Sequence, residues 1–341
     1  MMRSLIALGL VAAACSGGAD SPSTVRLMTH DSFEMTDDLA RFTERTGIQV
    51  QLITGGDAGE MLSRAIITKD NPVADVVFGI DNTFLGRALD EDIFDSYTPS
   101  AIDDLRPGLT EGTEGKVTPI DFANVCLNYD KAGLAEAGIE PPVRLEDLVA
   151  REYAGTLVVE DPSLSSTGLS FLLATIAQFG EGGWQDYWRG LRDNGVEVAA
   201  GWEQAYYGSF SGGSGTGERP IVVSYASSPP VEVIFAAEPI TEAPTAAVLD
   251  GCFRQIEYVG IVSGTDVRSE AEGLIDFMLQ KEVQEAIPLN MFVFPALESA
   301  ALPTEFMEHT ALPADPVTMS LGDIDANRDR WIAEWIDIVL R

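Results

Sequence analysis

Apolar and polar positions follow two rhythms along the first part of the chain. Short stretches in which every second residue is apolar, as in strands, alternate with stretches in which apolar residues recur every three or four positions, as in helices. The stretch 73–80 is almost continuously apolar, which is typical of a parallel strand covered on both faces. In chain order, the expected strands and helices are 25–29, 36–46, 48–52, 73–80 and 82–89. This order predicts an open α/β sheet.

The middle of the chain repeats this order, and two amphipathic helices follow it. In the last of these helices, Trp331 and Trp335 lie one turn apart, so we expect both to pack in the core. Two repeats of strand and helix predict two lobes, each with its own open sheet. The further expected strands are 156–159, 196–199 and 221–225, and the further expected helices are 168–179, 184–192, 202–210, 270–287 and 327–340.

The chain offers few parts for catalysis by the common motifs. It has two histidines, His30 and His309, and none of the usual zinc-site or serine-hydrolase motifs. The glycine-rich stretch 211–217 lacks the lysine of a phosphate-binding loop, so we interpret it as a connecting loop. Carboxylates are abundant, but the sequence alone does not bring two of them together. These observations favour a binding protein over an enzyme, and we expect no cofactor.

Composition and charge restrict the partners. The chain has 341 residues, of which 45% are hydrophobic, enough for a substantial core. Lys and Arg number 21 against 54 Asp and Glu, so the formal net charge is −33. A field of this sign repels nucleic acids and anionic lipid headgroups. We therefore exclude DNA and RNA as partners, while a cationic ligand is allowed.

The first residues have the pattern of an export signal. Arg3 supplies a positive charge, residues 5–11 form a short apolar run, and small residues lead to Cys15. The run is too short for a membrane span of about 20 residues, so it predicts a bacterial lipoprotein signal, cleaved before Cys15, whose thiol is lipidated. Ala12 stands where such signals usually have Leu, which leaves an ordinary secretory signal as the alternative. We expect residues 1–23 to be signal and linker, and the protein to be a lipid-anchored cell-surface or periplasmic protein.

Several segments, taken together, are specific enough to point to a family. With these segments, residues 25–340 resemble the thiamine-binding components of bacterial ABC importers, within a larger group that also contains iron-, sulfate- and polyamine-binding proteins. The segments that carry the resemblance are 29–33, 74–82, 161–169, 201–206, 224–229 and 286–295.

The resemblance implies a fold, a partner and a mode of action. The fold is the two-lobed, type II periplasmic-binding-protein fold, an α/β fold in which each lobe is an open sheet flanked by helices and crossing strands form the hinge. One lobe is expected to contain 24–121 with 260–341, and the other 122–259. A monomer of this kind closes on a small ligand, thiamine or thiamine phosphate, in the cleft between its lobes and delivers it to ABC permease subunits.

The resemblance also implies roles for individual residues. Asp57 corresponds to the acidic contact to the aminopyrimidine, and Trp202 and Tyr225 to the aromatic walls. Ser165 and Ser166 correspond to a polar loop that opens a helix N-terminus toward a phosphate end. Each of these residues also has a plain structural interpretation: a turn-forming Asp, core aromatics, and an N-cap. The remaining expected ligand-binding residues are His30, Asp31, Asp81, Asn82 and Phe292.

Four positions depart from the family pattern. Phe292 falls where the family more often has Trp, and His30 where it has Tyr. Asp37 lies near a family Trp, and Val231 replaces another Tyr. The expected cavity therefore has fewer aromatic walls, and the resemblance indicates the fold more firmly than the ligand.

The resemblance also suggests a disulfide. The chain is expected to cross between the lobes at 121–128 and 252–260, which would make these strands neighbours. Cys126 and Cys252 are the two cysteines other than Cys15. An oxidising compartment would let them pair, and two buried free thiols are the alternative.

Three other functions stay open at this point. Tyr206 and Tyr207 resemble the paired tyrosines of ferric-ion-binding proteins, and acidic, aromatic clefts also suit polyamines. A secreted thiamine-processing enzyme on the same scaffold is a third, more remote alternative.

Overall fold

The computed structural model describes residues 23–341. The expected lipidation site, Cys15, and the signal around it lie outside the described residues. Among the described residues, no helix has both the length and the apolar character that crossing a membrane requires.

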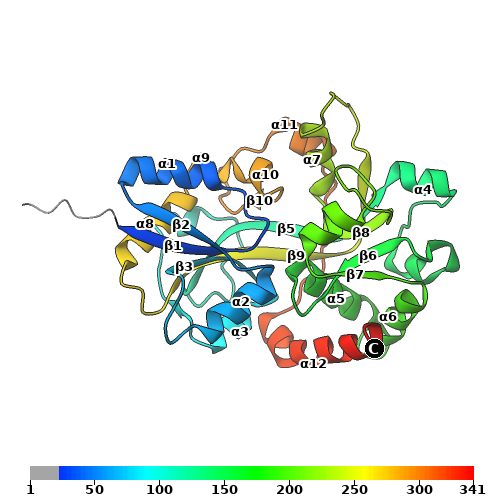
Figure 1. The fold of residues 1–341 in the computed structure, drawn as a ribbon, viewed down its shortest axis with the longest axis horizontal. Helices are drawn as coiled ribbons and strands as arrows, with labels where there is room; N and C mark the ends of the chain where they lie inside the picture. Colours follow the sequence, from blue (N-terminus) through cyan, green and yellow to red (C-terminus); the bar gives the residue numbers. More distant parts are fainter. Residues whose placement is uncertain (1–22) are drawn as a thin grey trace, which may run out of the picture.

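One hydrogen-bonded sheet runs through the whole molecule (Figure 1). Its strand order is β2-β1-β3-β9-β5-β8-β6-β7, with β10 added to β5 and β4 to β9. Neighbours are parallel at both ends of this order and antiparallel in the middle, where the long strands β5 and β9 pair. The bounds of the strands are β1 Thr24–Thr29, β2 Gln49–Thr54, β3 Val76–Asp81, β4 Phe94–Asp95, β5 Val117–Asp130, β6 Leu157–Glu160, β7 Glu197–Ala199, β8 Ile221–Tyr225, β9 Thr245–Val262 and β10 Phe294–Pro295.

Helices cover both faces of the two parallel ends. They pack there because successive side chains of a strand point to opposite faces: Leu27 and Met28 of β1 belong to separate apolar clusters. On one face Phe42 of α1 meets Phe277 of α8, with ring centroids 5.3 Å apart. The bounds of the longer helices are α1 Thr36–Thr46, α2 Ala58–Ile67, α3 Leu85–Asp90, α4 Lys131–Ala137, α5 Ser166–Phe179, α6 Trp184–Asp193, α7 Ser228–Ile234, α8 Arg268–Met278, α11 Thr304–His309 and α12 Leu321–Val339.

The expectation of two separate sheets is wrong in one respect. Each end is an open parallel sheet of three strands, as expected, but β5 and β9 pair along most of their lengths and join the two ends. These two strands cross where the sequence predicts the hinge. They bring the sulfurs of Cys126 and Cys252 to 2.06 Å, with Cα atoms 4.4 Å apart, as the predicted disulfide requires.

Two predicted helices differ from the structure. The helix expected over 270–287 ends at Met278 and is followed by two short helices, α9 Lys281–Gln284 and α10 Ile287–Asn290. The helix breaks at Gln280, whose backbone is extended. The break allows the buried side-chain amide of Gln284 to form hydrogen bonds with backbone groups of Ile120, Met278 and Leu297. The helix expected over 202–210 is largely a π-helix, Gln204–Ser209.

The last helix, α12, contacts both halves of the molecule. Its Trp335 packs edge-on against Trp188 of α6, with ring centroids 5.5 Å apart, and Arg328 lies over Phe84 beside α3. Trp331 and Trp335 are buried, so their predicted place in the core is confirmed. Because α12 spans both halves, the assignment of 260–341 to a single lobe stays a prediction.

Candidate functional site

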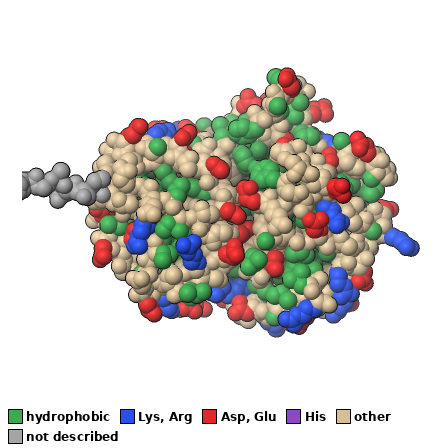
Figure 2. Space-filling view, in the orientation of Figure 1, with side chains coloured by type: hydrophobic (Ala, Val, Ile, Leu, Met, Phe, Trp, Pro, Cys, Tyr) green, Lys and Arg blue, Asp and Glu red, His purple; other side chains and the backbone are tan. Residues whose placement is uncertain are grey.

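A cavity of about 210 Å³ lies between the two halves, at the ends of their parallel strands. This is where open α/β sheets place ligands. Figure 2 shows acidic side chains gathered along the middle of the face that it draws, between the two halves. The cavity is lined by His30, Ser32, Glu34, Asp57, Ala58, Ser166, Thr167, Trp202, Glu203, Tyr207, Tyr225, Glu257, Asn290, Met291, Phe292 and Val293.

Asp57 joins three segments at the base of the cavity. It is the N-cap of α2, where its Oδ1 accepts a hydrogen bond from the Ala58 amide at 2.6 Å. The same oxygen accepts from the Ser166 amide, at the start of α5, and Oδ2 accepts from the Trp202 amide, both at 3.3 Å. Burial raises the pKa of Asp57, and the hydrogen bonds that the backbone amides of Ala58 and Ser166 donate to it oppose this rise.

One donor of the predicted phosphate end is taken by the protein itself. The first amide of α5, that of Ser166, already donates to the Asp57 carboxylate. Ser165 caps α5 by accepting from the Gly168 amide at 3.4 Å, and it does not line the cavity. Ser166 lines it, and its hydroxyl accepts from the Gln255 side chain at 2.9 Å.

The aromatic walls come from both halves. Trp202 stacks on Tyr206, with ring centroids 5.1 Å apart, and its indole N–H donates to Ser224 at 2.9 Å. Tyr207 meets the Trp202 ring edge-on. Phe292 reaches the cavity from the opposite half, on a backbone with φ of 60°, a conformation that non-glycine residues rarely adopt.

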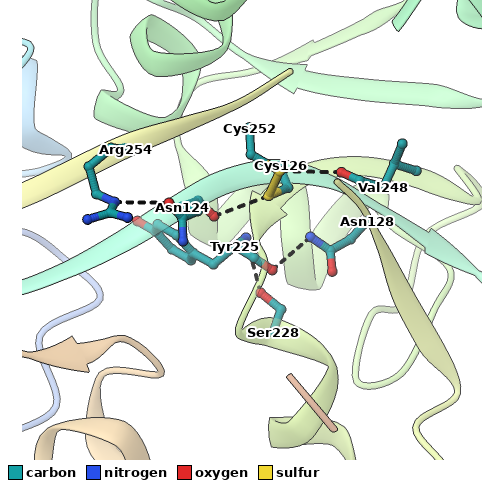
Figure 3. Close-up of a disulfide and its surroundings, with 8 residues drawn as sticks. All are labelled: Asn124, Cys126, Asn128, Tyr225, Ser228, Val248, Cys252 and Arg254. Carbon is teal, nitrogen blue, oxygen red and sulfur yellow. Dashed lines mark hydrogen bonds between the residues drawn. A yellow bond between two sulfur atoms is a disulfide. The ribbon is translucent and has the colours of Figure 1, made fainter. Parts of the chain in front are cut away.

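Tyr225 is held at the end of β8 by its backbone (Figure 3). Its amide donates to Ser228 at 3.2 Å and its carbonyl accepts from Asn128 at 2.9 Å, beside the paired cysteines. Burial, together with the carboxylate of Glu257, raises the pKa of Tyr225 well above its ordinary value, so the side chain stays a neutral phenol.

His30 lies at the end of β1, buried in the cavity wall. Its Nδ1 shares a hydrogen bond with Ser32 at 3.0 Å, and its Nε2 lies 3.7 Å from Oε1 of Glu257. Burial lowers the pKa of His30 to about 4, so the ring is neutral at neutral pH.

Besides Ser165, three more predicted residues do not line the cavity. Asp31 is exposed, and its amide donates to the Gly56 carbonyl. Asp81 is buried, where its carboxylate accepts from the amide and hydroxyl of Thr83. Asn82 faces the hinge strand, donating to Arg254 and accepting from the Ile256 amide. Of these three side chains, that of Asn82 thus holds the hinge strand β9.

Most of the acids of the cavity are not evident from the sequence. Glu34 and Glu203 are close enough to each other for Glu34 to raise the pKa of Glu203, after burial as the larger cause. Glu257 projects from β9, a strand that the sequence predicts as a crossing strand without indicating which of its residues face the cavity. Among the described residues, neither Lys nor Arg lines the cavity. The cavity therefore suits a cation.

The paired tyrosines do not face one site. Tyr206 is buried and donates its hydroxyl to Glu232 at 2.8 Å, while only Tyr207 lines the cavity. The two rings are nearly perpendicular, at 87°. Within residues 23–341, there is no group of three His, Cys, Asp or Glu arranged to hold a metal ion.

Comparison with known proteins agrees with this architecture. The thiamine-binding periplasmic protein of Salmonella typhimurium is 28% identical over 333 residues, which are 96% of this chain and 97% of that protein. The protein of that name from Escherichia coli is 28% identical over 86% of this chain and 85% of its own length. A solved structure of a periplasmic thiamin-binding protein superposes with a TM-score of 0.84 at 26% identity, covering 98% of this chain and all of that one.

More distant structures share the fold. Iron-bound HitA from Pseudomonas aeruginosa superposes with a TM-score of 0.74 at 18% identity, over 93% of this chain and 99% of that one. The two-lobed, type II fold that the resemblance implies is therefore confirmed. The family model described as "Bacterial extracellular solute-binding protein" matches residues 71–313. By this match, which covers most of the chain, the protein belongs to the bacterial extracellular solute-binding protein family.

Proposed function

We propose that this protein captures thiamine outside the cytoplasm and delivers it to the membrane subunits of an ABC importer. Relatives that match most of the chain are named thiamine-binding periplasmic proteins. The observation that carries the proposal is the cavity itself, which combines aromatic rings with carboxylates and has neither Lys nor Arg among its described lining residues. Thiamine is a cation with two flat heteroaromatic rings, so it needs this combination.

Each lining group has a role in this proposal. Trp202, Tyr225 and Phe292 provide flat surfaces for the two rings, and His30 adds a neutral ring at the base. Asp57 accepts from the aminopyrimidine, and Ser166 supplies a small polar contact beside it.

The same geometry favours free thiamine over its phosphate esters. A phosphate would have to enter a cavity lined by the carboxylates of Glu34, Asp57, Glu203 and Glu257. At the start of α5 the Ser166 amide already donates to Asp57 and the Gly168 amide to Ser165, and neither Lys nor Arg is among the described lining residues, so an anion would find few donors there.

Ligand capture depends on closure of the two lobes, which we assign as 24–121 with 260–341 and 122–259. The hydrogen bonds that the Ser166 and Trp202 amides donate to Asp57 link α2 to the other half, as does the bond from the Gly59 amide to the Leu164 carbonyl at 2.8 Å. Opening must break these bonds, and closing about the hinge strands removes the ligand from water. We also propose that the protein is a monomer, exported to the periplasm or cell surface and anchored to the membrane by a lipid on Cys15.

Calorimetry on the purified protein tests the function. We expect thiamine to bind, thiamine monophosphate to bind at least tenfold more weakly, and spermidine and ferric citrate to show no competition with thiamine. The bound vitamin should be recovered unchanged, which separates a transporter component from an enzyme. Tight binding of spermidine or ferric ion without binding of thiamine would refute the proposal.

A further inference from the structure

Three buried carboxylates form a row across the hinge. Asp81 of β3 is the register partner of Glu257 of β9, and Glu257 is also the partner of Asp121 of β5. Side chains of directly opposed residues project from the same face of a sheet. The exposed fractions of Asp81, Asp121 and Glu257 are 0%, 1% and 8%. Glu257, in the middle, lines the cavity, so the row connects the hinge to the ligand site.

The row lacks partners that would neutralise it. Within residues 23–341, no group outside the row donates a hydrogen bond to Asp121, and only one oxygen of Asp81 accepts one; Asp121 and Glu257 can bond each other only if one of them carries a proton. The nearest basic group to Glu257 is the His30 ring, whose Nε2 is 3.7 Å away, is buried, and has no hydrogen bond to any described residue. Buried polar groups are almost always paired, so these unpaired atoms call for a group that comes and goes.

The direction of the pKa shifts in the row favours a protonated carboxyl group in the empty protein. Burial raises the pKa of Asp81 to about 7. Burial first, and then repulsion between the carboxylates, raises the pKa of Glu257, and burial raises that of its neighbour Asp121. Carboxylates this close cannot all ionise.

Near neutral pH, the carboxylates of the row change charge, whereas the His and Tyr side chains around them do not. The pKa of His30 is lowered to about 4, and the pKa values of Tyr225 and Tyr258 are raised above their ordinary value, each mainly by burial, so none of these three groups changes charge near neutral pH. Asp57 of α2 also contributes repulsion and belongs to the same acidic field. The groups facing the row are His30, Asp57, Tyr225 and Tyr258.

We propose that Glu257, with Asp121 and Asp81 beside it, is the counter-ion of the ligand, and that the positive charge of the ligand replaces a proton that the row carries in the empty protein. This inference rests on the proposed function. On binding, an O–H bond of the row breaks, the proton leaves to solvent, and the carboxylate keeps the electron pair and faces the cation. The total charge within the site is therefore unchanged when the ligand enters.

The exchange has a defined pH dependence. Because the empty protein carries the proton and the complex does not, raising the pH favours the complex. One proton released per ligand corresponds to an affinity that rises by up to about tenfold per pH unit. The rise levels off above the pH at which the empty row loses its proton. Thiamine itself keeps its quaternary charge over this pH range, so the change of affinity with pH reflects titration of the protein.

Calorimetric titration with thiamine at about pH 7, in buffers of low and high ionisation enthalpy, counts the protons directly. The wild-type protein should release a substantial fraction of one proton per thiamine bound. Glu257→Gln should bind thiamine at least tenfold more weakly, with a proton release close to zero and an affinity that no longer rises with pH. Asp121→Asn should reduce the proton release in the same direction. Glu298→Gln, an exposed acid outside the cavity, should behave as the wild type.

The outcomes separate the two proposals. If thiamine binds to the wild type without releasing protons and with a flat pH profile, the exchange is refuted while the proposed function stands, even if a variant fails to fold. If Glu257→Gln retains the wild-type proton release, the row is not its source. If thiamine does not bind at all, the proposed function fails, and the inference fails with it.

Discussion

Trp202 is the ring on which the aromatic side of the cavity is organised, because Tyr206, Tyr207 and Tyr225 all pack around it. We expect Trp202→Ala to weaken thiamine binding by about 1–3 kcal/mol, through loss of stacking area and of a cation–π contact. Trp202→Phe keeps a ring but loses the hydrogen bond to Ser224, so its thiamine affinity should lie between those of the wild type and Trp202→Ala. Calorimetry measures the affinities. Val143→Ala, which shortens an exposed apolar side chain outside the cavity, is the control, and an unchanged affinity in Trp202→Ala would remove Trp202 from the site.

At the residue scale, we predict that Asp57 favours free thiamine over phosphorylated thiamine. Asp57→Asn keeps an oxygen that can cap α2 but removes the charge that faces the amides of Ser166 and Trp202. We expect thiamine to bind more weakly and the preference for thiamine over its monophosphate to fall by on the order of tenfold. Asp130→Asn is the matched control, because Asp130 caps α4 in the same way outside the cavity. A preference equal to that of the wild type would contradict the exclusion of phosphate by Asp57.

At the scale of the elements, the disulfide fastens the two crossing strands to each other. Its partners are 126 residues apart in sequence, so a covalent bond removes much freedom from the unfolded chain. Replacing both Cys126 and Cys252 by Ala should lower the free energy of unfolding by about 2–5 kcal/mol, with little effect on thiamine affinity in the folded protein. Denaturant unfolding with and without reductant measures this. Reductant should destabilise the wild type alone, and two free thiols in the unreduced wild type would show that the bond does not form.

Sequence patterns predict the elements well where local chemistry decides. The strand over 73–80 is close to β3, and the helix over 184–192 is close to α6, because burial and period are visible in the residues themselves. The break at Gln280 is not visible, since its cause is the bonding of Gln284 to distant backbone groups. The same holds for the site: Asp57 and Trp202 are found by their motifs, whereas Glu257 needs the register between β9 and its neighbours. Tertiary contacts, not propensity, place these residues.

At the scale of the whole molecule, the start of α2 lies against the loop before α5, and we predict that this contact forms when the lobes close. A methyl group added at Gly59 would lie 2.7 Å from the Leu164 carbonyl oxygen and 2.8 Å from that of Ser163. Both are backbone atoms, which cannot move aside as a flexible side chain can. The closed form thus has room for glycine alone at this position, although a helix by itself prefers Ala to Gly.

Gly59→Ala should therefore favour the open form without weakening the fold. We expect the free energy of unfolding to stay constant or rise by up to about 1 kcal/mol, while thiamine affinity falls by on the order of tenfold or more, because part of the binding energy must now force the lobes together. X-ray scattering should show a compaction on adding thiamine to the wild type and a smaller one in the variant. Gly273→Ala, in α8 with open space around it, should match the wild type. Full compaction and full affinity in Gly59→Ala would mean that the two halves do not meet at this contact in the ligand-bound protein.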